Sequence, residues 1–587
     1  MDKKSLLAFA IIFIVILAMP SYFKLINGPS EPMRPEIYKE EPLATPATID
    51  AQHLVVERPK RFSSNLNVIT ESEQRLITID TDFYSTQISS MGGGTIKYFK
   101  LKNYNMFTDG DTALVQLINN ADALPLLIKY ISIDGDSVGL NQNFTVDNIS
   151  GSSAESNAIH LTKNERSTIT FILKNSANKQ LATKSLTFFG DQYAIEIQTD
   201  LRGLQSEMAT KHYDLSWDGG LKYTEQTLID EVRYSKAYAY SGGETDALDV
   251  KNNKSDGSRF TGKTDWTAIR TKYFASAFIT HGGGVGYKLT ATGIPLEGKN
   301  YYKKYSMQVS LPADNVTKTT LYLGPLEYST IKEFDVDLEN IMSLGKLLKP
   351  ISKAVLWIFI RLRVILPNYG WVLIVFAFLI KIVLYPLTNK SMQSMKEMQN
   401  LQPKIEELRK KYQGDPQKLN TEQMKLYKEH GVNPMGGCLP LLLQMPILIA
   451  LFTVFRTTIE LRHAPFIWWI TDLSAPDTIF TLPFAIPIYG QHVNVLPIIM
   501  ALSTILQQKL SGSSSSNPQQ KMMTYMMPIM FFFMFNQFPS GLNLYYTLFN
   551  LLTVAQQKLV PSKPKRKSNR PSTIDTLRKL QSKTKFK

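Results

Sequence analysis

Long apolar runs lie near the two ends of the chain, and a long stretch of mixed composition lies between them. Apolar blocks of spanning length occur within residues 1–25 and 350–560, whereas residues 26–345 contain none. A helix needs about 20 consecutive apolar residues to cross a bilayer. The pattern therefore predicts a membrane protein with one large water-exposed insert.

The first apolar run predicts an N-terminal transmembrane anchor. Residues 2–4 (Asp-Lys-Lys) precede an uninterrupted apolar stretch over 6–19, which is similar to a secretory signal. Pro20 stands at the candidate cleavage site, where a small residue is needed. We therefore expect residues 1–25 to remain as an uncleaved anchor, followed by an extended, proline-rich linker over 26–64.

Period-two alternation of apolar and polar positions dominates the insert. Segments such as residues 76–88 (LITIDTDFYSTQI) and 272–278 (KYFASAF) alternate in this way, and glycine clusters such as 92–94 and 242–243 lie between segments. Alternation with frequent glycine turns is typical of antiparallel sheets. We predict a large antiparallel β-sandwich domain over residues 65–335.

The C-terminal part of the chain is predicted to be helical. Residues 346–366 mix basic and apolar positions at helical spacing, which favours an amphipathic helix lying in the membrane surface. Five spans follow within residues 367–560, at about 369–387, 436–456, 492–509, 522–538 and 541–558. Together with the anchor they predict six transmembrane helices around a five-helix core.

The segment after the first of these five spans has a helical pattern of its own. Apolar residues recur every three or four positions, and Gly414-Asp415-Pro416 makes a turn. We therefore predict an amphipathic helical hairpin over residues 390–431, standing on the membrane. Its apolar positions include Met392, Met395, Met398 and Leu401.

The charge distribution predicts the orientation in the membrane. The loop over residues 388–435 is rich in Lys and Arg, whereas residues 536–543 carry no charge. Loops on the cytoplasmic side carry an excess of Lys and Arg. We therefore expect both termini and the hairpin in the cytoplasm, with the β domain on the other side.

The net charge of +15 is concentrated in the C-terminal tail, residues 561–587. A short basic segment of low apolar content binds polyanions, either anionic lipid or nucleic acid. The side chains expected to make this contact include Lys563, Lys565, Arg566, Lys567 and Arg570.

The sequence contains no recognisable enzyme motif. Residues 282–288 (GGGVGYK) lack the Gly-Lys-Ser/Thr ending of a phosphate loop, and the histidines show no HExxH spacing. Cys438 is the single cysteine, so no internal disulfide can form. We expect no catalytic residue, no metal site and no cofactor.

Lys381 interrupts an otherwise apolar span. A charge at the bilayer centre costs roughly 2.5–3.5 kcal/mol, and such groups usually face a cavity or a partner. One interpretation is that the side chain snorkels to the headgroups. The other is that it faces a wet cavity lined by amides, among them Gln444, Gln508 and Asn543. The amides can alternatively hold helices together.

Five stretches of the membrane region resemble the YidC/Oxa/Alb family of membrane protein insertases. They are NYGWVLIVFAFLIKIVLYPLT (368–388), LQPKIEELRKKY (401–412), VNPMGGCLPLLLQMPI (432–447), ELRHAPF (460–466) and FPSGLNLYYTLFNLLTVAQQ (538–557). The anchor and the outer domain are similar to the Gram-negative form. The resemblance implies a multi-pass protein of the bacterial inner membrane with a periplasmic β domain and no enzyme activity.

The resemblance also implies site residues and partners. It places a positive residue of a hydrophilic groove at Lys381, where the best-known Gram-negative members have arginine, and places Tyr545 and Tyr546 along the path of the substrate. A lysine keeps the charge but lacks the planar fork of arginine. The hairpin would receive the substrate. The implied partners are nascent membrane proteins, the Sec translocon (SecYEG and SecDF), the ribosome and anionic lipids.

Two other functions stay open when the residues are considered alone. The chain could be a small-solute transporter with Lys381 as an anion site, although paired, glycine-interrupted half-helices are not evident. It could also be a membrane-tethered periplasmic carbohydrate-binding protein or enzyme in which the β domain is the active part.

Overall fold

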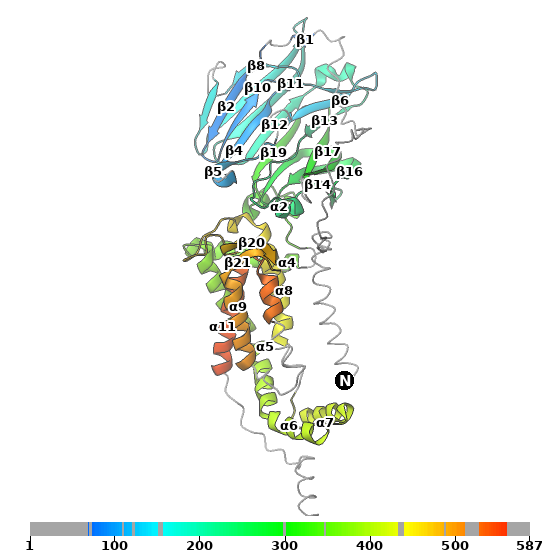
Figure 1. The fold of residues 1–587 in the computed structure, drawn as a ribbon. Coiled ribbons are helices and arrows are strands. Elements are labelled where there is room, and N and C mark those ends of the chain that lie inside the picture. The colour runs from blue at the N-terminus through cyan, green and yellow to red at the C-terminus, as the bar shows by residue number, and fades with distance from the viewer. Residues whose placement is uncertain are drawn as a thin grey trace, which may run out of the picture. The chain divides into compact units, whose positions relative to one another are not determined.

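The structure is a computed structural model. It describes residues 68–69, 73–108, 111–119, 124–150, 157–296, 301–345, 348–432, 439–486, 489–510 and 528–559. The chain divides into two compact units, a strand-rich unit within Asn27–Met342 and a helical unit that includes Ser343–Lys587 (Figure 1). The predicted anchor, linker and basic tail lie outside the described residues.

The larger sheet of the strand-rich unit has fourteen strands and is antiparallel. Its central path runs through β10 (Arg166–Asn175), β11 (Gln180–Phe189), β12 (Ala194–Asp200), β19 (Thr317–Pro325), β17 (Phe274–Pro295), β18 (Tyr301–Pro312) and β13 (His212–Trp217). The other members are β1 (Val68–Ile69), β6 (Leu127–Ile131), β7 (Ser137–Gly139), β8 (Thr145–Ile149), β14 (Lys236–Ser241), β15 (Glu244–Leu248) and β16 (Ser255–Arg270). Burial alternates along β11 and β18, as expected for strands with one face on a core.

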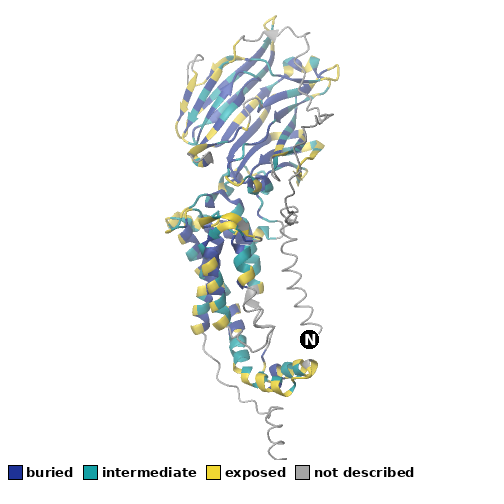
Figure 2. Cartoon of the chain, viewed as in Figure 1, coloured by how far each residue is buried: buried dark blue, intermediate teal, exposed yellow. Residues whose placement is uncertain are grey.

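The smaller sheet has five strands. Their order is β5 (Asp111–Gln116), β4 (Thr95–Thr108), β3 (Tyr84–Ser89), β2 (Leu76–Thr81) and β9 (Ala158–Leu161), and β2 pairs with β9 in parallel. Gly94, in the turn before β4, lies against Leu186 and Phe171 of the larger sheet. The two sheets thus share a buried core (Figure 2), and the prediction of a β-rich domain in this part of the chain is confirmed.

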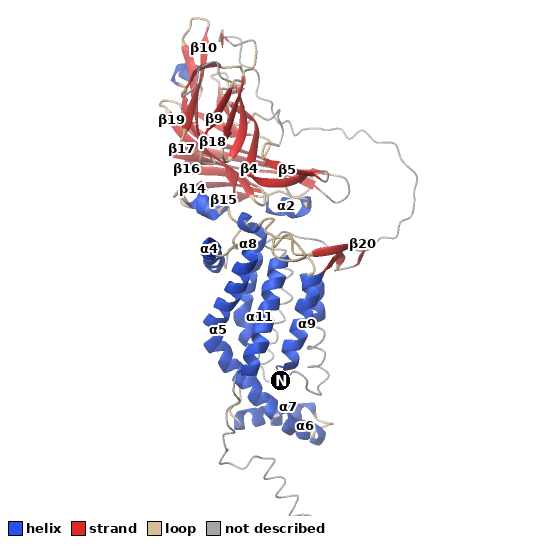
Figure 3. Cartoon of the chain, turned by 90° about the vertical axis from the view of Figure 1, so that its left-hand side faces the viewer, coloured by secondary structure: helices blue, strands red, loops and turns tan. Residues whose placement is uncertain are grey.

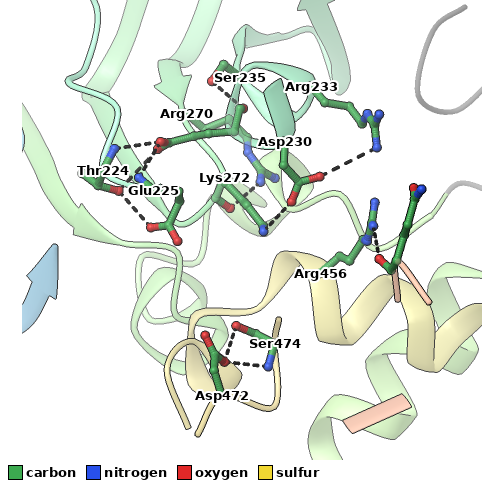
Figure 4. Close-up of polar contacts among 12 residues, drawn as sticks. Thr224, Glu225, Asp230, Arg233, Ser235, Arg270, Lys272, Arg456, Asp472 and Ser474 are labelled. Carbon is green, nitrogen blue, oxygen red and sulfur yellow. Dashed lines mark hydrogen bonds and ion pairs between the residues drawn. The ribbon is translucent and has the colours of Figure 1, made fainter. Parts of the chain in front are cut away.

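Charged side chains hold short helical elements against the larger sheet (Figure 4). Asp230, on α2 (Leu228–Tyr234), accepts from Lys272 at 2.7 Å and lies 3.7 Å from Arg233. The buried Arg270 donates to the carbonyl oxygen of Ile341 at 2.9 Å. Helices α3 (Tyr328–Lys332) and η2 (Leu338–Ile341) complete the unit, so Arg270 fastens its last turn to the sheet.

The helical unit is a bundle with a small hairpin at one end (Figure 3). Its helices are α4 (Lys349–Ile365), α5 (Tyr369–Asn400), α6 (Gln402–Lys411), α7 (Pro416–Glu429), α8 (Leu439–Thr457), α9 (Val495–Leu510) and α11 (Ser540–Leu559), with residues 528–535 also helical. A short turn η4 (Ile459–Leu461) and the strands β20 (Thr478–Ile486) and β21 (Gly490–Asn494) lie between α8 and α9. The ring of Phe359 on α4 contacts Phe376 of α5 and Phe455 of α8, which forms part of the bundle core.

Helix α5 is longer than the span predicted over 369–387. It continues past Pro386 to Asn400 without a break. Hydropathy marks where the apolar side chains end, but the helical spacing of the following methionines continues in the same register. The predicted hairpin over 390–431 therefore begins within the end of α5, and its two short helices are α6 and α7.

Among the described residues, α5 is the one helix that is long and apolar enough to span a bilayer by length and composition. Residues Leu442–Thr457 and Val495–Leu510 form shorter apolar helices. The total of six transmembrane helices stays a prediction.

Candidate functional site

The helical unit carries apolar side chains on its surface and polar side chains inside. Exposed apolar residues include Phe378, Ile382 and Val383 on α5, and Leu502 and Leu506 on α9. Buried polar residues include Lys381, Thr388, Gln444, Ser503, Thr504, Asn543, Asn550, Thr553, Gln556 and Gln557. Water-soluble bundles have the opposite distribution. This distribution suits a bundle that is surrounded by lipid and encloses a polar interior.

Lys381 is the one charged side chain among these buried polar residues. Its side chain is only 8% exposed, and its Nζ donates to Thr553 Oγ1 at 2.7 Å. The same Nζ lies 4.5 Å from the ring centroid of Phe549, within the range of a cation–π interaction. Thr553 and Phe549 are both on α11, so these contacts join α5 to α11.

The spans supply no counter-ion for this ammonium group. The sequence contains no Asp or Glu in 349–396, 430–459 or 478–574, which include all the predicted spans after the anchor. The described residues place no carboxylate within 4.0 Å of Lys381. A buried charge without a compensating charge is costly. The site can therefore attract an anionic group.

Polar side chains on α11 repeat at the spacing of one helix face. Asn550 Nδ2 donates to Ser503 Oγ at 3.0 Å and to Thr504 Oγ1 at 2.9 Å, both on α9. Gln556 Nε2 donates to Thr388 Oγ1 of α5 at 3.2 Å. These bonds extend the polar interior from Lys381 toward the hairpin and connect three helices.

The other predicted groove residues make no contact with Lys381 that joins them to its ammonium group in the described part of the chain. Gln444 and Asn543 are buried and Gln508 is half-buried, but the described residues show no hydrogen bond from any of them to Lys381. Asn543 instead donates to the carbonyl oxygen of Phe535 at 3.2 Å. Polar atoms of all three amides have no hydrogen-bond partner among the described residues.

Tyr545 and Tyr546 are both buried but face different neighbours. The Tyr545 ring lies 5.9 Å from Phe376 of α5 and 6.0 Å from Phe549. The Tyr546 ring lies 5.7 Å from Phe535, on the helical stretch before α11. Of the two rings, Tyr545 is thus on the side of α11 that faces α5.

The predicted substrate-receiving residues partly fill the hairpin's own interior. Met392 and Leu401 are buried, and Leu401 forms a small core with Tyr427 and Val432. Met398 packs against this core, and Met395 is half-buried. In this conformation the residues do not form an open apolar surface.

The opposite end of the bundle, which we call the loop end, is tied together by hydrogen bonds. Asp472 Oδ1 accepts from the backbone N–H and hydroxyl of Ser474, both at 2.7 Å (Figure 4). Ser540 Oγ, at the start of α11, donates to the carbonyl oxygen of Asp472 at 2.7 Å. Asp477 Oδ2 accepts from the N–H of Leu496 at 2.8 Å and so caps α9.

Two glycines permit close packing at the loop end. A Cβ atom at Gly541 would lie 2.2 Å from the ring of Phe455, and one at Gly370 would lie 1.9 Å from the ring of Phe466. Real side chains do not approach so closely, so both positions require glycine as packed. The loop end is therefore held together by both hydrogen bonds and close packing.

The described part of the chain contains no group of three or more His, Cys, Asp or Glu side chains that could hold a metal ion. The absence of a cofactor from the whole protein stays a prediction.

Comparisons with known proteins decide the family. Residues 361–567 match the family described as "60Kd inner membrane protein", and residues 76–358 match "YidC periplasmic domain". "Membrane protein insertase YidC" of Chlorobium luteolum is 36% identical over 583 residues, covering 96% of this chain and 95% of the relative. The chain belongs to the YidC family of membrane protein insertases. The Chlorobaculum parvum member is 36% identical over 575 residues, covering 95% of this chain and 94% of the relative.

A solved structure titled "Active YidC insertase crystal structure with the first transmembrane domain resolved" is 20% identical in sequence. It covers 84% of this chain and 94% of its own, with a TM-score of 0.36.

Membership of the YidC family makes this chain an inner-membrane insertase with a periplasmic β-rich domain and a helical region. The family resemblance given by the sequence stretches is thereby confirmed. The transporter and the carbohydrate-binding protein, which the residues alone left open, are set aside.

Sequence reasoning missed the hydroxyl groups of this candidate site. Thr553 is the hydrogen-bond partner of Lys381, and Thr388 is the partner of Gln556. A signal was present, because Thr553 follows Asn550 by three positions and so lies on the same face of a helix.

Proposed function

We propose that this insertase moves the polar outer tails of nascent membrane proteins through a recess around Lys381. The recess is the polar interior formed by Lys381, Thr388, Asn550, Thr553 and Gln556. The observation that carries the proposal is a buried ammonium group in a bundle whose spans contain no carboxylate. An acidic group on the arriving tail would supply the missing counter-charge.

The attraction between Lys381 and an acidic group of the tail is large enough to offset part of the cost of bringing that tail into the bilayer. Two opposite charges 4 Å apart interact by about 4 kcal/mol at the effective dielectric constant of partly buried sites. Polar groups of the tail also lose water on entering the bilayer, which costs energy unless new hydrogen bonds form. The hydroxyls and amides beside Lys381 offer such bonds.

We propose that the substrate leaves the recess because its own apolar segment and acidic tail favour their final positions in the membrane. The apolar segment of the nascent protein gains free energy by leaving water for lipid. A membrane potential that is positive outside favours an outer position for acidic tails by about 2.3 kcal/mol per charge per 100 mV. No step that consumes a nucleotide is needed.

We place the hairpin end of the bundle in the cytoplasm and the loop end in the periplasm. The basic residues of the hairpin region support this orientation. The bonds of Asp472, Asp477 and Ser540 support a recess that is closed toward the periplasm. Six transmembrane helices, with both termini in the cytoplasm, are part of the same proposal.

The remaining partners are proposed on chemistry and family resemblance. Met392, Met395, Met398 and Leu401 would meet substrate after the small hairpin core opens. The basic tail, with Lys563, Lys565, Arg566, Lys567 and Arg570, would hold ribosomal RNA and anionic lipid through charge. The Sec translocon (SecYEG and SecDF) is the proposed membrane partner.

Crosslinking to a stalled nascent chain tests the route of the substrate. A photoreactive amino acid is placed at Thr553, inside the recess, and in a second protein at Ile382, which is 68% exposed on the lipid side of α5. The substrate has an acidic tail followed by one apolar segment. We expect the tail to crosslink to position 553 and not to position 382. Tail crosslinks at 382 alone would contradict the route.

A further inference from the structure

The hairpin of β20 and β21 exposes large apolar side chains at the loop end. Ile479 and Phe480 are each 58% exposed, and Phe484 is 61% exposed. Ile479 and Phe480 are consecutive in β20, where the register with β21 is irregular. Strand β20 therefore carries large apolar side chains that the described residues of the helical unit leave uncovered.

Water is a poor environment for such a hairpin. Two-stranded hairpins are at best marginally stable in water without a packed apolar face. Residues 478–494 contain no Asp, Glu, Lys or Arg. A solvated edge element usually carries charges, so this composition indicates an apolar or interfacial surrounding.

Strand β21 and the turn before it are fixed by hydrogen bonds, although the apolar side chains of β20 are exposed. Asn536 Nδ2 donates to the carbonyl oxygens of Tyr489 at 3.0 Å and His492 at 2.8 Å. Asn494 donates in turn to Asn536. The Tyr489 ring also lies 5.3 Å from Phe532. The exposed side chains of β20 thus lie on a strand that is paired with the fixed strand β21.

The hairpin is continuous with the lipid-facing surface of α9. Strand β21 ends at Asn494 and α9 begins at Val495. The exposed apolar side chains of α9 begin at Ile498, about 6 Å along the helix from Asn494. Figure 3 shows β20 extending sideways from the end of the bundle rather than along the helices.

A tryptophan pair lies in the same segment between α8 and α9. Trp468 is strongly exposed, and its ring stacks on Trp469 at 5.7 Å. Tryptophan is enriched where lipid headgroups meet the acyl chains. This loop therefore has the composition of a membrane interface.

We propose that the hairpin of β20 and β21 lies in the outer leaflet of the lipid bilayer, at the boundary between headgroups and acyl chains. There it anchors the loop end in the membrane, to the side of the helical bundle. The inference adds a lipid-binding element to the proposed function, and only the choice of leaflet rests on the orientation proposed above.

The unpaired backbone groups of the hairpin determine how deeply it can enter the bilayer. Open strand edges have unpaired N–H and C=O groups, which are too costly to place in the hydrocarbon core. Headgroups and their water can satisfy these groups while the apolar side chains point into the acyl region.

The alternative to a lipid-binding role is that the open edge of this hairpin pairs with an extended polypeptide. Pro483 lies inside β20, and the register with β21 is irregular between Thr481 and Ile486. Proline removes a backbone donor and blunts an edge strand. The edge is therefore a poor template for another strand, whereas its side chains suit lipid.

Spin-label accessibility in liposomes of bacterial phospholipids tests the proposal. Cys438 is the single cysteine, so a Cys438→Ser background allows one nitroxide to be placed at a time. Labels are attached at Phe480→Cys and Phe484→Cys. The controls are Leu502→Cys, which is 61% exposed on α9, and Ile133→Cys, which is 63% exposed in the β unit.

Collisions with dissolved oxygen report lipid, and collisions with a water-soluble nickel chelate report water. We expect the labels at 480 and 484 to favour oxygen, as at Leu502, whereas the label at Ile133 favours the chelate. Labels at 480 and 484 that favour the chelate would overturn the proposal. Labels shielded from both reagents would also overturn it, because the hairpin would then be covered by protein.

A charge variant gives a second readout. Phe484→Asp should shift the label at position 480 toward the nickel chelate, because a carboxylate opposes burial in the interface. Gln491→Asp adds the same charge at an exposed polar position of β21 and should leave the label unchanged. An equal response to both variants would overturn the proposal.

Discussion

At the scale of single residues, Lys381 distinguishes this bundle from an ordinary membrane protein core. Its ammonium group has three donors, and the described residues provide one hydrogen bond, to Thr553, and one aromatic face, on Phe549. Neither group carries a negative charge. The side chain is therefore held in place while its charge remains available.

We predict that Lys381→Glu reduces insertion of substrates with acidic outer tails about tenfold more than insertion of substrates with neutral tails. A reversal of charge replaces an attraction of a few kcal/mol with a repulsion, and each 1.4 kcal/mol is a factor of ten. Insertion into proteoliposomes measures the effect. Lys381→Arg keeps the charge and is the matched control. Equal loss for both kinds of tail would remove the electrostatic role of Lys381.

Lys184 is a second buried lysine, in the β unit on β11. Its Nζ donates to the carbonyl oxygen of Leu126 at 2.5 Å and is fully buried, and this burial lowers the pKa of Lys184 to about 7. The pKa of lysine in an unfolded chain is about 10.4. Between these two values the unfolded state binds more protons than the folded state.

The free energy of unfolding of the β unit should therefore rise from pH 7 to pH 10, with a Lys184 contribution of at most about 1.4 kcal/mol per pH unit. Lys184→Met should remove this contribution, and Lys179→Met, at an exposed lysine, should not. Hydrogen exchange of β10 and β11, corrected for the intrinsic rate at each pH, measures the slope. The same slope in both variants would contradict the prediction.

At the scale of elements, the loop end depends on close helix packing. Gly541, in the first turn of α11, lies against the buried ring of Phe455. Phe455 also lies 6.2 Å from Phe359, so its ring has little room to move.

Gly541→Ala should destabilise the helical unit by about 1–3 kcal/mol, because the added methyl group overpacks the core. Denaturant unfolding in detergent measures the change. Gly414→Ala is the control, since a Cβ atom there meets no atom within 4 Å. If both variants unfold alike, the loop end is not close-packed.

The sequence predicts most elements but not their contacts. Alternation indicates the β unit, and apolar runs indicate α5, α8, α9 and α11, because these patterns are local. The hydrogen bond between Lys381 and Thr553 depends on how α5 and α11 are rotated relative to each other, and the periodicity of apolar residues does not determine this rotation. The continuation of α5 to Asn400 was missed because hydropathy measures composition rather than helical continuity.

At the scale of the whole molecule, we propose that the recess binds the nascent protein while the basic tail binds the ribosome that makes it. Truncation after Pro561 should weaken ribosome binding most at low salt, because phosphate contacts release counter-ions. Co-sedimentation over a salt series measures this change. Replacement of the same tail with an uncharged tail of equal length is the control, because it separates the effect of the charge from the effect of the length. Unchanged binding at low salt would show that the tail does not hold the ribosome.

The most direct test of the central claim is whether water reaches Lys381 from the hairpin end. Thr553→Cys and Ile382→Cys are compared in the Cys438→Ser background, in inverted inner-membrane vesicles treated with a membrane-impermeant maleimide. Our account predicts that the thiol at 553 reacts, because it lies in the polar recess, and that the thiol at 382, which faces lipid, does not. A thiol at 553 that is as unreactive as the one at 382 would contradict the account.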